Sequence, residues 1–446
     1  MIKSHLNQEE VTKSFVGAAL LFLTANFMTT RVSGQAPANT DTTQFATTAA
    51  TEQRIISRVD TIYLAPAKEA KTPWYKTLSI RGYAQVRYNR LLETNPQLKC
   101  DQCDKSLGAG NGFFIRRARI VFSGNVHERL FVYIQPDFAS SPGGTALNFV
   151  QLRDAYFDLA LDAAKEFRIR VGQSKIPFGF ENMQSSSNRL ALDRSDAINS
   201  AFANERDLGL MFYWAPSEIR ERFEELTSSG LKGSGDYGVF GIGVFNGQTS
   251  NKSDANDQLH TAVRLAYPLK LTNGQFIEPG IQAYTGKYVV TPDQLSSGVS
   301  LGTEQQIEEG FTDRRVAASL VIYPQPLGFQ AEYNIGEGPE FDPETMSIKV
   351  KSLHGGYAQT MYRMKVGDHV LIPFAKVQYY DGGKKHERDA TSHKVYETEV
   401  GAEWQPFKNF ELVADYSIAD RTTKTASNLY NRQHGSRLRL QAQFNF

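Results

Sequence analysis

The sequence has very few cysteines and no apolar run that is long enough to form a membrane-spanning helix. Only Cys100 and Cys103 occur among its 446 residues, as Cys-Asp-Gln-Cys. A zinc site of the usual kind needs a second pair or suitably spaced histidines, and a redox pair needs a βαβ context. Neither is present, so we expect no metal and no other cofactor. We interpret the two cysteines as a loop pair, either as thiols or as a small disulfide in an oxidising compartment.

An excess of charge of one sign is also absent, because 49 Lys and Arg face 48 Asp and Glu. This balance gives no indication of a nucleic-acid partner. The mean hydropathy of -0.40 is too polar for a helical membrane protein. It is compatible with a membrane β-barrel, because half of each barrel strand faces water. The 28 Phe and 20 Tyr residues could supply its aromatic girdles.

The amino-terminal region reads as an export signal. Two lysines precede an apolar run at residues 15–23, and small residues follow at 33–36. The run is shorter than the roughly 20 residues of a spanning helix, and a membrane-spanning chain without such a helix must form a closed barrel. We therefore predict a signal peptide at 1–35 and a Thr-, Ala- and Pro-rich periplasmic leader at 36–77, mostly extended or disordered.

From residue 78 onward, segments of about ten residues alternate apolar and polar side chains, as barrel strands do. Soluble sheets alternate too, so the number and spacing of the segments matter more than any one of them. We predict strands near 78–89, 112–124, 128–139, 148–161, 166–174, 206–216, 235–246, 257–271, 275–290, 312–323, 327–337, 350–364, 369–381, 393–405, 409–420 and 436–446. Bacterial barrels use even numbers of strands, and these make sixteen.

The joins between these segments alternate short and long, which predicts periplasmic turns and outer loops. The third outer join, residues 175–205, is the longest and is polar, so we expect it to fold into the lumen and narrow the pore. One join breaks this alternation of lengths. Residues 216–234 should form a periplasmic turn but are long and charged, and we predict a short helix there without a function.

Alternation also divides the charged residues between two walls of the lumen. The basic wall, on the first five strands and the last, contains Arg81, Arg87, Arg117, Arg119, Arg168, Arg170, Arg437 and Arg439, with Lys175 at the start of the third outer loop. The opposite wall contains Glu332, Glu397, Glu399, Glu403 and Asp415, with Lys376 among them. Crowded charges of one sign create a potential that passing ions feel, and arginine binds phosphate or carboxylate with two parallel hydrogen bonds. The alternative is that these residues pair and only solvate the pore.

Three segments carry a family resemblance. They are Ile-Arg-Arg-Ala-Arg-Ile at 115–120, Gln-Leu-Arg-Asp-Ala-Tyr at 151–156 and Val-Gly-Gln-Ser-Lys-Ile-Pro-Phe at 171–178, and residues 373–382 also fit. With these motifs the chain resembles the phosphate-selective porin O/P family over residues 78–446. The resemblance implies a sixteen-stranded trimeric porin whose third loop enters the lumen.

By the same resemblance, lumen arginines and a lysine attract anions, at the matching positions Arg116, Arg117, Arg119, Asp154 and Lys175. Arg116 is out of phase with its neighbours, so we expect it at the rim of the barrel, in the headgroup region. We expect Asp154 to be a salt-bridge partner of nearby arginines rather than an ion ligand.

The chain ends on Phe446, the last residue of an alternating strand, as in the signal by which the barrel assembly machinery recognises its substrates. Together these features predict an all-β protein, a transmembrane antiparallel β-barrel of sixteen strands at 78–446. We expect a homotrimer in the lipid of the bacterial outer membrane that passes small anionic solutes such as phosphate.

Three alternative functions would each leave a different pattern in the sequence. A non-specific diffusion pore is suggested by the acidic wall. An adhesin or receptor barrel would need longer outer loops. An outer-membrane enzyme would need Ser, His and an acid grouped on the outward face, and the alternation shows no such group, so we expect no enzymatic activity.

Overall fold

The computed structural model describes residues 73–98, 112–140 and 148–446. The predicted signal peptide, residues 36–72 of the predicted leader and both cysteines lie outside these residues. The last residues of the leader, Trp74–Thr77, form the 3₁₀ helix η1 rather than the extended chain that the sequence predicts. Among the described residues, no helix is long and apolar enough to cross a membrane.

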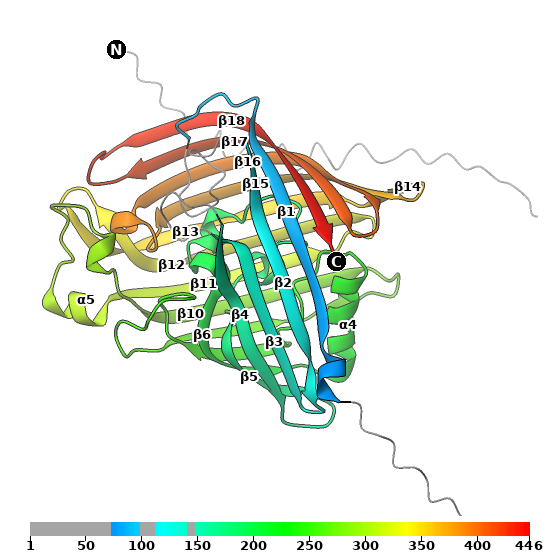
Figure 1. Cartoon of the computed structure of the whole chain (residues 1–446). Helices are drawn as coiled ribbons and strands as arrows, with labels where there is room; N and C mark the ends of the chain where they lie inside the picture. The colour runs from blue at the N-terminus through cyan, green and yellow to red at the C-terminus, as the bar shows by residue number, and fades with distance from the viewer. Residues whose placement is uncertain (1–72, 99–111, 141–147) are drawn as a thin grey trace, which may run out of the picture. The chain divides into compact units, whose positions relative to one another are not determined.

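Strands dominate the described part of the chain (Figure 1). They are β1 (Ser79–Leu91), β2 (Phe113–His127), β3 (Leu130–Ser140), β4 (Phe149–Ala160), β5 (Phe167–Lys175), β6 (Arg206–Trp214), β7 (Phe240–Phe245), β8 (His260–Ala266), β9 (Leu269–Lys270), β10 (Phe276–Tyr288), β11 (Phe311–Ile322), β12 (Leu327–Asp342), β13 (Ser347–Tyr362), β14 (Met364–Val366), β15 (His369–Gly383), β16 (Ser392–Phe407), β17 (Phe410–Lys424) and β18 (Asn431–Asn445). The helices are α2 (Phe180–Met183), α3 (Asp196–Asn199), α4 (Ser217–Ser228) and α5 (Glu304–Glu309), with 3₁₀ turns η2 (Ala203–Glu205), η3 (Pro292–Gln294) and η4 (Arg388–Ala390).

These strands form one closed antiparallel barrel. Each strand pairs with its neighbour in the sequence, and β1 pairs with β2 on one side and with β18 on the other. The eighteen strands β1–β18 form a barrel of sixteen strands, because β9 continues β8 along β10 and β14 continues β13 along β15. The sixteen-stranded antiparallel barrel predicted from the sequence is thus confirmed, with strand ends that differ by a few residues.

The side chains alternate as the sequence predicts, with charge inside and apolar groups outside. On β16, Glu397, Glu399 and Glu403 are buried, whereas Val400 and Trp404, at positions of the other parity, are exposed on the outer surface. This is the reverse of a soluble protein, where exposed strand residues are mostly polar. It is the arrangement expected when the outer surface meets lipid and the interior meets water.

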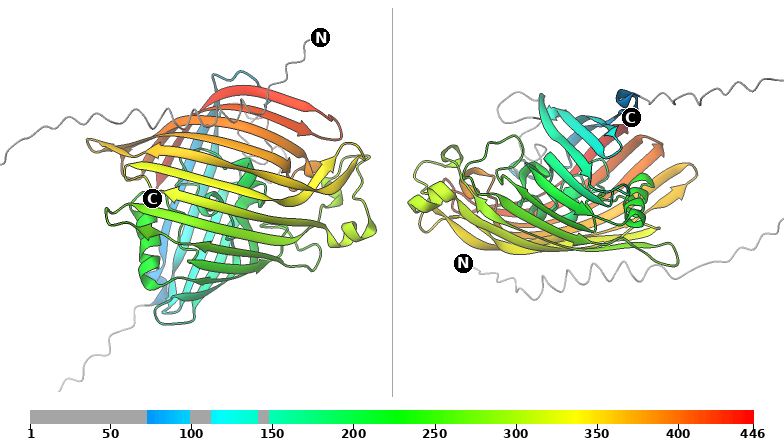
Figure 2. Two further views of the ribbon diagram at one scale, coloured as in Figure 1. Left: turned by 180° about the vertical axis from the view of Figure 1, so that it is seen from behind. Right: turned by 90° about the horizontal axis from the view of Figure 1, so that it is seen from below.

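Joins at the two ends of the barrel differ in length, although the β12–β13 join, expected to be long at 338–349, is a turn of only four residues because both strands extend further than predicted. At the opposite end from this turn, all joins but one are short. The exception is the join between β6 and β7, which contains the predicted helix as α4 (Ser217–Ser228). Figure 2 shows α4 at the same end as the carboxyl terminus and α5, which belongs to a long join, at the opposite end. In barrels of this class the short turns are periplasmic. We call residues 176–205 the β5–β6 segment and residues 215–239 the β6–β7 segment.

Candidate functional site

The structure places the predicted lumen residues on the inner side of the barrel. Fourteen of them are almost completely buried, namely Arg87, Arg117, Arg119, Arg168, Arg170, Lys175, Arg437, Arg439, Glu332, Lys376, Glu397, Glu399, Glu403 and Asp415. Arg81 is exposed and lines a large cavity inside the barrel. Their placement agrees with the alternation, whereas their part in ion passage stays a prediction.

The acidic wall does not present free carboxylates. Glu403 forms an ion pair with Lys232 (2.6 Å), and Glu397 with Arg421 (2.8 Å). Glu399 and Asp415 share Arg439, at 2.7 and 2.8 Å. The expected potential from this wall is therefore largely cancelled by cations inside the barrel. The alternation missed Lys232, because it lies on a join and not on a strand.

Glu332, the remaining member of the acidic wall, binds the β5–β6 segment. Its carboxylate accepts hydrogen bonds from the backbone N–H groups of Phe180 (2.5 Å) and Glu181 (2.8 Å), at the start of α2. The hydroxyl of Tyr357 donates a third bond at 2.8 Å. Glu332 thus positions the segment.

Several basic-wall residues also have carboxylate partners. Arg119 pairs with Asp137 (2.8 Å), and Arg168 pairs with Asp236 (2.7 Å). Arg170 of β5 holds Asp158 of the neighbouring strand β4 with two hydrogen bonds of 2.7 and 2.9 Å. Arg206 of β6 reaches past β5 to Asp154 of β4 at 2.9 Å. The expectation that Asp154 serves as a salt-bridge partner is therefore confirmed.

Other basic residues remain without a carboxylate. Within the described ranges, Arg81 and Arg437 take part in no ion pair, and Arg117 donates a hydrogen bond only to the neutral side chain of Gln85 (2.8 Å). Arg189 of the β5–β6 segment is also buried, and two of its guanidinium nitrogens lack a hydrogen-bond partner in this part of the chain. Unpaired positive charge therefore exceeds unpaired negative charge on this side of the lumen.

The β5–β6 segment lies against the inner faces of most of the strands. Its apolar residues Ile176, Phe178, Ala201 and Phe202 pack on β6, β7, β8, β10 and β11, and Leu190, Ala191 and Leu192 pack on β13, β15 and β17. Polar contacts extend this contact to β1 and β18: Tyr83 binds Ser186 (2.6 Å), and Arg439 pairs with Asp193. Among the described residues, no hydrogen bond or ion pair joins the segment to β3 or β4.

Lys175, at the start of this segment, has a structural partner. Its ammonium group donates hydrogen bonds to the backbone carbonyls of Met183 (2.9 Å) and Gln184 (2.8 Å). These bonds hold the chain in the turn that follows β5. The side chain still borders the cavity below, so it can contribute charge there while it fixes the segment.

Two β-bulges add arginines to the side of the lumen that the segment leaves open. The pairing of β1 with β2 shifts between Arg117 and Ile115, and that of β3 with β4 between Asp154 and Leu152. An extra residue in one strand lets two successive side chains share one face. Arg116 is half-buried, and its charge acts on Arg189 and Arg194 inside the lumen, so it does not lie in the headgroup region at the rim as expected. Arg153 is buried beside Asp154, which strict alternation could not reveal.

The resulting cluster contains Arg116, Arg117, Arg119, Arg153, Arg189, Arg194 and Arg206, which we call the arginine cluster. The positive charges of the cluster lie close together. Burial, and then the positive charges of Arg189 and Arg117, hold the pKa of the Arg194 guanidinium well below its usual value. Glu205 pairs with Arg194 and Arg206, and Asp137 lies 3.5 Å from Arg153. Even with these carboxylates and Asp154, the cluster retains an excess of positive charge.

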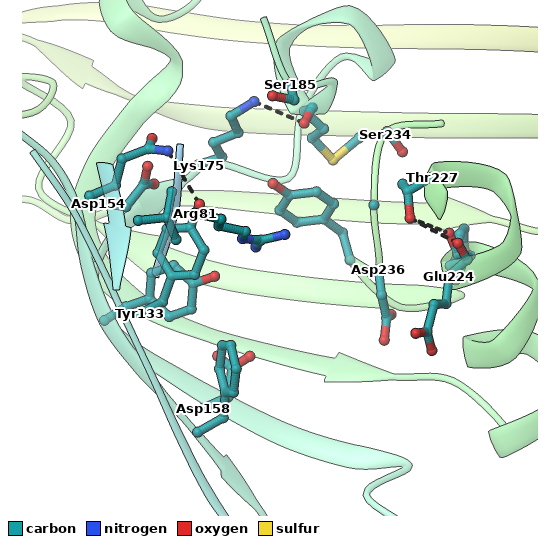
Figure 3. Close-up of a pocket in the computed structure, with 18 of the residues that line it drawn as sticks. Arg81, Tyr133, Asp154, Asp158, Lys175, Ser185, Glu224, Thr227, Ser234 and Asp236 are labelled. Carbon is teal, nitrogen blue, oxygen red and sulfur yellow. Dashed lines mark hydrogen bonds between the residues drawn. The ribbon is translucent and has the colours of Figure 1, made fainter. Parts of the chain in front are cut away.

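Below the cluster lies a cavity of about 1250 Å³, bounded by β1–β5, by the underside of the β5–β6 segment and by the β6–β7 segment (Figure 3). Tyr133 and Tyr156 stack with ring centroids 5.1 Å apart, and the guanidinium of Arg170 lies 3.9 Å above the Tyr156 ring. Arg81 extends into the cavity near Tyr133. Among the described residues, no group of His, Cys, Asp and Glu is arranged to hold a metal ion.

Comparison with known proteins agrees with this architecture. The family model described as phosphate-selective porin O and P matches residues 97–446. No curated protein matches the chain. Among solved structures, the outer membrane channel DcaP of Acinetobacter baumannii superposes with a TM-score of 0.52 at 14% identity, covering 83% of this chain and 97% of that one. OmpF of Salmonella typhi, solved in complex with daunomycin, gives 0.51 at 14% identity with the same coverage. At these identities the two structures support the fold alone.

Proposed function

Because the chain belongs to the phosphate-selective porin O and P family, and is thus a porin of the bacterial outer membrane, we propose that it passes small anions such as phosphate by passive diffusion. The observation that carries this proposal is the arginine cluster beside β2 and β4. A porin performs no bond chemistry, so its selectivity depends on the charges at its narrowest section.

The proposed path follows the side of the lumen that the β5–β6 segment leaves open. Arg117 and Arg189 form no ion pair there with any residue that the structure describes, and they attract anions through the water of the pore. Anions then reach the cavity, where Arg81 is exposed and unpaired among the described residues. The family resemblance and the charge distribution both support selectivity for anions over cations.

The first test is the reversal potential of the purified protein in a planar bilayer under a potassium chloride gradient, with and without added phosphate. We expect a potential of the sign given by chloride permeation, and a reduced chloride current when phosphate competes for the cluster. Equal permeation of potassium and chloride would contradict the proposed selectivity and leave a porin without charge preference.

That second candidate, a general diffusion pore, has support of its own. Most strand charges form internal pairs, such as Arg170 with Asp158 and Arg439 with Asp415, and paired charges exert little net field. Under this alternative the current should scale with the bulk mobility of each ion, and phosphate should leave the chloride current unchanged.

We also propose that the barrel assembles as a homotrimer, as the family resemblance implies. The outer surface of β1–β4 supports this, because Ile80, Phe113 and Val150 are more than 60% exposed in the single chain. Such exposed apolar side chains can face either lipid or another copy. Cross-linking in detergent distinguishes them, and a product confined to the monomer would contradict the trimer.

A further inference from the structure

The β6–β7 segment (residues 215–239) has no counterpart among the other joins at the periplasmic end, which are short. It begins with α4, whose Ile219 and Phe223 pack with Ala215 and Val239 at the base of β6 and β7. Leu226, one turn further along, is also buried. The helix is therefore a fixed part of the barrel end.

After α4 the chain turns into the lumen. Leu231 packs in a cluster with Phe276, Val321 and Tyr323, on the inner side at the ends of β10 and β11. The same cluster contains Phe180 of the β5–β6 segment. The β6–β7 segment thus fills space between the barrel wall and the underside of the first inward-folded segment.

The next residue, Lys232, connects the segment to β16 on the other side of the lumen. Its ammonium binds both carboxylate oxygens of Glu403 on β16, at 2.6 and 2.9 Å, and both side chains are buried. Its backbone carbonyl accepts a hydrogen bond of 2.6 Å from the side chain of Gln184. A buried pair of this kind is costly to break on one side, so it fixes the segment in place.

The returning part of the segment is anchored on the other side. Asp236 pairs with Arg168 of β5 (2.7 Å) and with Arg220 of α4 (2.9 Å). Arg264 of β8 donates a hydrogen bond of 2.6 Å to the carbonyl of Gly238. The segment therefore lies along the inner faces from β6 to β11 and reaches β16.

The part of the lumen that remains open at this level is the cavity described above. Its walls are β1–β5, with Glu411, Asn445 and Phe446 from β17 and the end of β18, and its far side is formed by Arg220, Phe223 and Asp236 of the β6–β7 segment. In Figure 3, Asp236 and Glu224 lie across the cavity from Tyr133 and Asp158.

We infer that the β6–β7 segment is a second constriction of the pore, on the periplasmic side, and that Lys232 with Glu403 holds it closed against the opposite wall. Solutes that pass the arginine cluster then leave only along β1–β5. Two narrow sections in series divide the tasks: the cluster selects charge, and the β6–β7 segment limits size and current.

The test replaces residues 216–238 with an Asn-Gly turn, which closes short hairpins readily. Because the resistance of two sections in series falls when one is widened, the single-channel conductance should rise about twofold, while the reversal potential stays the same. Larger polyethylene glycols should also enter from the periplasmic side. Strand-dominated circular dichroism identifies correctly folded protein.

A point variant provides a second, milder test. Lys232→Met releases the segment from Glu403 and should raise the conductance and the current noise. Lys270→Met is the matched control, because Lys270 pairs with Glu225 on the exposed side of α4 (3.0 Å), away from the cavity, and should leave both unchanged. A folded deletion variant with the wild-type conductance and polymer limit would overturn the inference. Loss of anion preference in the wild type would contradict the proposed selectivity but not the second constriction.

Discussion

Arg117→Gln tests the arginine cluster most directly. Arg117 is buried on β2 and, within the described ranges, is hydrogen bonded only to Gln85. The charged groups that act on it most strongly are Arg116, Arg189 and Arg119. Glutamine keeps a polar side chain toward Gln85 and removes one positive charge. Removal also relieves repulsion among like charges, so the barrel should remain at least as stable as the wild type.

The size of the effect follows from Coulomb's law. A unit charge about 6 Å from a passing ion, in water with a dielectric constant of about 80, contributes about 0.7 kcal/mol. This lowers the local anion concentration about threefold and raises that of cations equally, so the anion-to-cation permeability ratio should fall about tenfold. A lower effective dielectric constant in the narrow pore would enlarge the change.

The assay is the reversal potential across a planar bilayer under a salt gradient. Arg314→Gln is the matched control, because Arg314 lies on the outer surface in a pair with Glu337 (2.7 Å) and should not affect permeation. An unchanged reversal potential in Arg117→Gln, with normal conductance, would refute the idea that ions pass this cluster.

Three further outcomes are expected. Arg439→Met leaves Asp193, Glu399 and Asp415 buried without their shared cation, so the free energy of unfolding should fall by about 3–5 kcal/mol. The change should appear as a lower urea midpoint in detergent. A smaller decrease in stability than in Lys270→Met, which breaks an exposed pair, would contradict this prediction. Burial alone would raise the pKa of Asp196 in the β5–β6 segment, but Arg421 and Lys384 hold that pKa below its usual value, so the stability that Asp196 contributes is present above about pH 4 and is lost as the pH falls through the lower folded pKa. Between pH 7 and pH 3, the melting temperature of Asp196→Asn should therefore fall less than that of the wild type. Parallel curves would contradict a stabilising role for the contacts of Asp196 with Arg421 and Lys384. Gly82→Val should impair closure of the barrel, because a Cβ there would lie 2.3 Å from the carbonyl oxygen of Arg119 and 2.5 Å from the ring of Phe446, whereas Ala84→Val on the same strand should be tolerated; equal yields of folded protein from both would refute it.

The barrel and its division into an inner and an outer surface could be predicted from the order of the residues alone. Successive side chains of a strand point to opposite faces, so Arg437, Arg439 and Glu399 could be assigned to the lumen from spacing alone. Alternating join lengths likewise identified the long β5–β6 join and the anomalous helix α4. These features are local, because covalent geometry sets the two-residue period.

Which of the inward-facing charges are available to ions depends on contacts between residues that are far apart in the chain. Lys232 and Glu403 meet although 171 residues separate them, and the bulges at Arg116 and Arg153 depend on the register between neighbouring strands. Lys175, which the family resemblance places among the anion-attracting residues, borders the cavity and also donates hydrogen bonds to carbonyls of the β5–β6 segment, which its position in the sequence did not indicate. Pairing across a closed barrel depends on register and on the path of the joins, and neither is encoded in the alternation of a single strand.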